Sequence, residues 1–114
     1  MGSEELLKQN INEFLEEAER TSKSGSFNTA ATIYFKALAV IADLFILRQK
    51  GFIPKNHAER FRILEESYME IYILLNRDFP IYQQSYRIKL TREHSEVLKK
   101  DVKQLVKLTN LEDN

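Results

Sequence analysis

An arginine and a histidine lie close together in the segment from Arg87 to His94, and their side chains suit chemistry on a phosphodiester. Six residues separate them, in the order Ile-Lys-Leu-Thr-Arg-Glu. The planar guanidinium group of an arginine can hold two phosphate oxygens at once. Histidine can move a proton near neutral pH, because its unperturbed pKa is about 6.5. Such a pair could cleave RNA without a metal ion. The histidine would accept the 2′-hydroxyl proton while the arginine stabilises the charge that builds on the phosphate.

The same residues also have a structural interpretation. A histidine in the first turn of a surface helix is usually only solvated, and Arg87 could pair with a nearby glutamate. The tyrosines of this half of the chain could stack on exposed bases. At helical spacing, however, such residues more often form the edge of a core or a dimer contact: Tyr68, Tyr72, Tyr82 and Tyr86.

Two further polar residues call for an interpretation. Asp43 lies in a long apolar segment, where an unpaired buried carboxylate would be costly. We therefore expect it to pair with Arg48 or Lys36, or to face a polar cleft in which it supports Arg87. His57 follows Asn56 at a predicted helix start, and we interpret it as a residue of the capping region rather than a ligand.

The composition excludes several kinds of site. The chain has no cysteine, so disulfides, thiolate metal sites and cysteine nucleophiles are excluded. Its two histidines lie far apart in sequence, with no acidic residue at ligand spacing, and we expect no metal and no cofactor. The formal net charge is 0, so the whole molecule does not attract nucleic acid. Residues 1–20 are acidic while 48–62 and 87–107 are mostly basic, so a local basic face could still meet an anion.

Periodic apolar residues predict an all-α chain that forms a single domain over residues 1–114. A first helix is expected to be capped by Ser3 and to end at the serine-rich segment 22–26. Asn28 is expected to cap the second helix, which runs to about Lys50 and stops at a glycine.

The second half of the chain predicts three more helices. Asn56, followed by a glutamate three residues later, is a capping-box pattern that opens the third helix. That helix is expected to end between residues 76 and 80, with Pro80 starting a short fourth helix up to Tyr86. Thr91 is expected to cap the last helix. With short connections, these elements predict an up-and-down bundle of four to five helices.

The segment from Ala30 to Leu47 is apolar almost all round and approaches the length of a membrane span. Lys36 and Asp43 would each cost about 2.5–3.5 kcal/mol near the centre of a bilayer. We therefore predict a central helix buried by its neighbours. The acidic first residues are unlike a signal peptide or a transit peptide, and we expect a cytoplasmic protein.

One short pattern resembles the second half of a tetratricopeptide repeat. The segment from Gly25 to Ala30, followed by Tyr34 and Ala37, has the turn glycine, the small residue and the aromatic of that repeat. It occurs once, whereas about three stacked repeats are needed for stability. A tetratricopeptide-like adaptor is therefore the third of the functions that we consider.

A second pattern covers nearly the whole chain. An acidic amphipathic helix precedes a Gly-x-Phe turn and a long helix rich in alanine and aromatic residues. The loop from Gly51 to His57, a third helix, the Ser85-Tyr86 pair and a basic last helix follow. In this order the chain resembles the HEPN superfamily of nucleotide-binding helical proteins, in particular its small stand-alone prokaryotic members.

The HEPN resemblance implies a bundle of four to five helices that often forms a dimer. Many members are metal-independent ribonucleases with an Arg-x(4–6)-His motif beside the last helix, which Arg87 and His94 match at its longest spacing. A polar residue on the second helix often supports the site, and Asp43 is the candidate here. Other members lack the motif and pair with minimal nucleotidyltransferases in toxin–antitoxin-like systems.

Two functions are thus expected ahead of the adaptor. The first is a metal-independent ribonuclease that acts on RNA or a nucleotide through Arg87 and His94 in a toxin–antitoxin-like system. The second is a non-catalytic interaction module that pairs with a minimal nucleotidyltransferase or with itself, as a homodimer.

Overall fold

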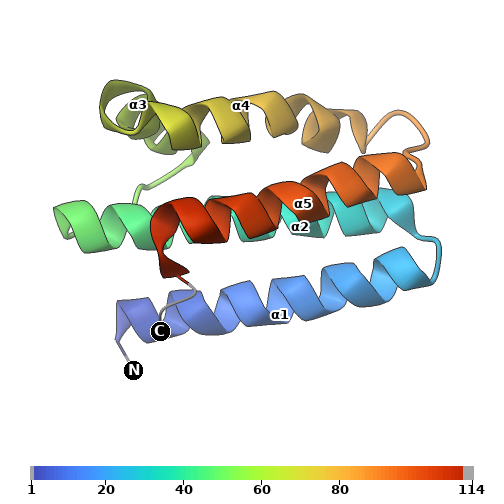
Figure 1. The fold of residues 1–114 in the computed structure, drawn as a ribbon, viewed down its shortest axis with the longest axis horizontal. Coiled ribbons are helices and arrows are strands. Elements are labelled where there is room, and N and C mark those ends of the chain that lie inside the picture. Colours follow the sequence, from blue (N-terminus) through green and yellow to red (C-terminus); the bar gives the residue numbers. More distant parts are fainter. Residues whose placement is uncertain (1, 112–114) are drawn as a thin grey trace.

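The computed structural model describes residues 2–111 of the chain. They form five helices and the loops that join them. The helices are α1 (Ser3–Lys23), α2 (Phe27–Lys50), α3 (His57–Ser67), α4 (Met69–Gln84) and α5 (Arg92–Thr109). Figure 1 shows three layers, with α1 on one side, α2 and α5 in the middle, and α3 and α4 on the other side. The prediction of an all-helical bundle is confirmed.

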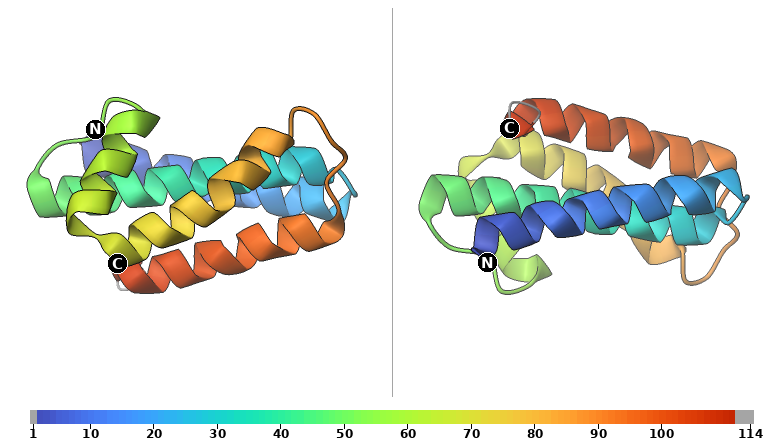
Figure 2. Two further views of the ribbon diagram at one scale, coloured as in Figure 1. Left: turned by 90° about the horizontal axis from the view of Figure 1, so that it is seen from above. Right: turned by 90° about the horizontal axis from the view of Figure 1, so that it is seen from below.

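The central helix of the bundle is α2, against which α1, α4 and α5 all pack. Figure 2 shows α1 lying along α2 on one side and α4 crossing it on the other. Half of its 24 residues are buried, among them five alanines that let neighbouring helices approach closely. By length and composition alone α2 could cross a membrane, yet 67% of its most apolar window is buried inside the bundle. The prediction of a buried central helix is confirmed.

The ends of α2 agree only in part with the prediction. Gly51 ends the helix in the left-handed conformation (φ 85°), and its N–H donates to the carbonyl of Leu47 at 2.8 Å. The start is different, because Ser26 occupies the N-cap position and Asn28 lies inside the first turn. The prediction that Asn28 caps α2 is therefore wrong. Ser3 is likewise the first residue of α1 rather than its cap, a position held by Gly2.

The third predicted helix is divided in two at Tyr68. Asn56 caps α3 as predicted, since its side chain accepts the N–H of Glu59 at 2.9 Å. The helix then breaks at Tyr68 (φ −140°, ψ 65°), and α4 begins at the next residue. The Tyr68 ring packs edge-on against Phe45 of α2, with 4.9 Å between ring centroids, and the Lys50 ammonium lies 5.9 Å from it. Packing against α2 thus accompanies a break that neither glycine nor proline causes.

Pro80 lies inside α4, so the predicted end of a helix at residues 76–80 and the short fourth helix from Pro80 are wrong. Proline lacks the N–H that would bond to the carbonyl of Asn76, one turn earlier. Both residues occupy exposed positions, where water can satisfy the freed carbonyl. The helix therefore continues to Gln84, while its other face packs Ile71 and Leu75 into the core.

Candidate functional site

The loop of residues 85–91 joins α4 to α5, and Asn28 of α2 fixes its backbone. The Asn28 amide nitrogen donates to the carbonyls of Ser85 (2.9 Å) and Ile88 (2.6 Å), and its carbonyl oxygen accepts the N–H of Leu90 (2.9 Å). One turn along α2, the Thr32 hydroxyl donates to Ser85 Oγ at 3.0 Å. The loop that carries Arg87 is therefore attached to the central helix at both of its ends.

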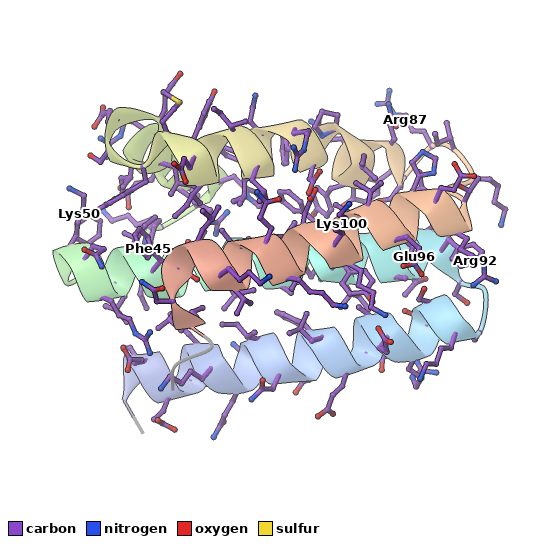
Figure 3. The ribbon with its side chains drawn as sticks, viewed as in Figure 1. Phe45, Lys50, Arg87, Arg92, Glu96 and Lys100 are labelled. Carbon is purple, nitrogen blue, oxygen red and sulfur yellow. The ribbon has the colours of Figure 1, made fainter. Side chains whose placement is uncertain are left out.

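Arg87 is exposed on this loop, and no hydrogen bond, ion pair or ring contact joins its side chain to any other residue in the described range 2–111. Figure 3 shows the side chain pointing outward, away from the helices. It borders an open hollow of about 580 Å³ at the end of α4, which is lined by Pro80, Gln83, Gln84, Tyr86, Arg87 and Ile88. The guanidinium group is therefore available to an anion.

His94 is the third residue of α5 and belongs to its cap. Its Nδ1 accepts the N–H of Thr91 at 3.0 Å, and the Thr91 hydroxyl also lies 3.0 Å away. Because a backbone N–H can only donate, the neutral ring carries its own proton on Nε2. The one nitrogen that could accept a proton is thus already occupied. His94 could act as a base only after releasing the Thr91 amide.

The structure places Arg87 and His94 at the two sides of one helix junction without a direct interaction. Within residues 2–111 no hydrogen bond links the two side chains, and His94 is not among the residues that line the hollow beside Arg87. Arg92, also at this junction (Figure 3), lies with its guanidinium carbon 5.2 Å from the ring centroid of Phe27. Arg87 is therefore more available than Arg92 to bind a ligand.

Asp43 is held in a different part of the molecule. Its two carboxylate oxygens accept hydrogen bonds from Arg60 of α3, from Nε at 2.7 Å and from Nη2 at 2.9 Å. Both side chains are nine-tenths buried. The predicted pairing with Arg48 or Lys36 is wrong, because Arg48 instead binds Glu4 of α1 at 2.9 Å.

The position of Asp43 also separates it from the Arg87 loop. Asp43 lies fifteen residues further along α2 than Asn28, about 22 Å at the rise of an α-helix. Asn28, not Asp43, is the polar residue of α2 that reaches the loop. Asp43 fixes the start of α3 on α2 instead.

His57 completes the cluster around Asp43. It is the first residue of α3, as predicted, and its Nδ1 lies 2.6 Å from Nη1 of Arg60, which can only donate. The ring also contacts Phe35, Phe79 and Tyr82, with centroids 5.7–6.4 Å apart. Partial desolvation, together with the charge of Arg60, lowers the pKa of His57, although Asp43 acts in the opposite sense. The side chain is therefore neutral near pH 7.

Comparison with protein family models, with curated proteins and with solved structures found no match to the chain. The HEPN resemblance therefore depends on the sequence patterns of this chain alone.

Several polar residues of structural importance were missed from the sequence. Arg60 was missed because its carboxylate partner lies in another helix, and Asn28 was assigned to a helix cap because its true partners lie in a distant loop. A signal did exist for Asp101, since it falls within the buried stripe of Leu98, Val102 and Leu105 on α5.

We predict that Asn28→Ala releases the Arg87 loop while the bundle stays folded. The substitution removes the three hydrogen bonds that Asn28 makes to the loop and leaves the one between Thr32 and Ser85. Trypsin should then cut after Arg87 and Lys89 at least about tenfold faster than in wild type, because each lost bond contributes about 1 kcal/mol. Asn12→Ala, on an exposed face of α1, is the matched control. Equal cleavage rates in all three proteins would show that Asn28 does not hold the loop.

We predict that the Asp43–Arg60 pair stabilises the fold only as a pair. Asp43→Ala leaves the buried guanidinium without a carboxylate and should cost about 3–5 kcal/mol of unfolding free energy in urea titrations. The double variant Asp43→Leu/Arg60→Met replaces both charges by apolar groups and should recover most of that loss. A double variant as unstable as the sum of its single substitutions would contradict this explanation.

Proposed function

We propose that the chain is a HEPN-type interaction module that pairs with a second copy of itself, and that it acts in the cytoplasm. The observation that carries the proposal is the distribution of exposed apolar side chains. Of the eight large hydrophobic residues exposed within residues 2–111, five belong to α4, the following loop and α5. We call this set the α4–α5 face: Met69, Ile73, Tyr86, Ile88 and Val97.

The position of α4 makes this face available to a partner. In Figure 1, α4 belongs to an outer layer, and Figure 2 (left) shows α4 and α5 with no helix above them. Arg77 of α4 binds Asp101 of α5 at 3.0 Å. By helical spacing, Ile73 and Val97 each lie one turn from this ion pair. An apolar surface interrupted by one ion pair is suited to a protein interface.

The geometry of His94 supports a binding role over a catalytic one. Its Nδ1 accepts the Thr91 N–H in the helix cap, so neither the hydroxyl of an RNA nor a water can use that nitrogen at the same time. The bundle itself is what the HEPN resemblance implies. A tetratricopeptide-like adaptor is less well supported, because α1, α4 and α5 all pack against the single helix α2.

A metal-independent ribonuclease of HEPN type is the second candidate, which the free guanidinium group of Arg87 favours. Arg87 borders a hollow that could receive a phosphate, and the loop beneath it is held by Asn28. In this mechanism Arg87 holds the phosphate, and His94 leaves Thr91 to take the 2′-hydroxyl proton. A toxin–antitoxin-like system is then the expected setting, whereas a minimal nucleotidyltransferase is the alternative partner of the non-catalytic module.

We predict that Val97→Asp weakens self-association, because it places a charge in the α4–α5 face. Light scattering after gel filtration should show a dimer for wild type and a shift toward monomer for the variant. Leu6→Asp is the matched control, since Leu6 is a similarly exposed apolar residue but lies on α1. The proposal fails if wild type is a monomer at micromolar concentration, or if the Leu6 variant dissociates as readily as the Val97 variant.

We predict no RNA cleavage above background when a mixed pool of structured and single-stranded RNA is incubated with wild type in EDTA. His94→Ala and Arg87→Ala, each with unchanged helical circular dichroism, provide the baselines. Cleavage by wild type that both substitutions abolish would establish the ribonuclease and fix the roles of both residues. If wild type and both variants cleave no more RNA than buffer does, the ribonuclease is ruled out and the interaction module remains.

A further inference from the structure

Two buried carboxyl groups, Asp78 and Asp101, lie between α4 and α5 beneath the α4–α5 face. Asp78 of α4 is 0% exposed and Asp101 of α5 is 5% exposed. Arg77 donates to Asp101 Oδ1 at 3.0 Å, and its Nε lies 3.8 Å from Asp78 Oδ1. Both oxygens of Asp78 and the Oδ2 of Asp101 receive no hydrogen bond from any residue in the described part of the chain.

Two such carboxylates cannot both be charged without a large cost. Burial disfavours each charge, and a neighbouring carboxylate disfavours it further. One proton removes most of this cost, because a protonated carboxyl group can donate to its neighbour. Burial, then hydrogen bonding to Asp101 and the charge of Asp101, together raise the pKa of Asp78 to about 8, although Arg77 acts in the opposite sense.

We propose that Asp78 and Asp101 share one proton, which makes the contact between α4 and α5 a pH-dependent tie. With the proton in place, Asp78 donates to Asp101, and the two helices are joined by a satisfied hydrogen bond. Without it, two buried negative charges face each other across the helix interface.

The neighbouring helices supply little to offset the second charge. Among residues 2–111, the charged groups that act on Asp78 are Asp101 of α5 and Arg77 of α4, whose side chain is 55% exposed and therefore largely screened by water. The buried charges of α2 and α3, Asp43 and Arg60, are committed to each other. The shared proton is thus the main way in which Asp78 and Asp101 avoid the cost of two buried negative charges.

The direction of the pH dependence follows from the two states. In the unfolded chain Asp78 has its ordinary pKa of 3.8, and in the folded protein its pKa is about 8. Between these values the folded protein holds a proton that the unfolded chain has lost, so stability falls as pH rises. The contribution is complete below the lower value and is fully lost above the upper one.

The test combines carboxyl titration with unfolding. In the wild-type protein, ¹³C NMR of the aspartate carboxyl groups should show that Asp78 titrates several pH units above an ordinary aspartate. The melting temperature of wild type should fall between mildly acidic and mildly alkaline pH. Asp78→Asn should show a much smaller fall, because its amide donates to Asp101 at every pH. Glu70→Gln, an exposed acid on α4, should behave as wild type.

Two results would overturn the proposal. One is an Asp78 carboxyl group that titrates in the ordinary aspartate range. The other is an Asp78→Asn variant whose melting temperature falls in parallel with that of wild type. If Asp78→Asn does not fold, the titration of the wild-type protein decides alone.

Discussion

Burial of α2 is the constraint on which the rest of the structure depends. A helix that is apolar on nearly all sides is stable in water only when other helices cover it, and α1, α4 and α5 do so. Several polar residues of α2 have partners that lie outside this helix. Asn28 binds the loop before α5, and Asp43 binds Arg60 at the start of α3. The central helix thus positions the irregular segments as well as the core.

The contacts of α2 with the loop and with α3 bear on both candidate functions. The loop under Arg87 is attached to α2, so the guanidinium group projects from a fixed base, which reduces the entropic cost of binding. Both histidines, in contrast, accept a hydrogen bond on Nδ1, His57 from Arg60 and His94 from Thr91. A side chain already used to hold a helix end is poorly placed to move a proton. The exposed apolar residues of the α4–α5 face are consequently the stronger basis for a function.

Local sequence patterns predicted the features of the fold that depend on residues close together in sequence. Apolar periodicity located the helices, and Asn56, Thr91 and Gly51 marked helix ends correctly, because a cap depends on residues within one turn. Other features depend on contacts between distant residues. The break at Tyr68 involves packing on Phe45, and Asn28 contacts residues 57 to 62 positions away. Pro80 was misleading, because its exposed position lets α4 continue through it.

The most direct test of the central role of α2 is hydrogen exchange at the Leu90 amide. This N–H belongs to a loop and has Asn28 Oδ1 as its acceptor, so its protection reports the link between α2 and the loop. We expect it to exchange at least about a hundredfold more slowly than an unstructured peptide amide, as an amide in a stable hydrogen bond does. Exchange at the rate of a free peptide would show that α2 does not hold the loop, and would contradict the account.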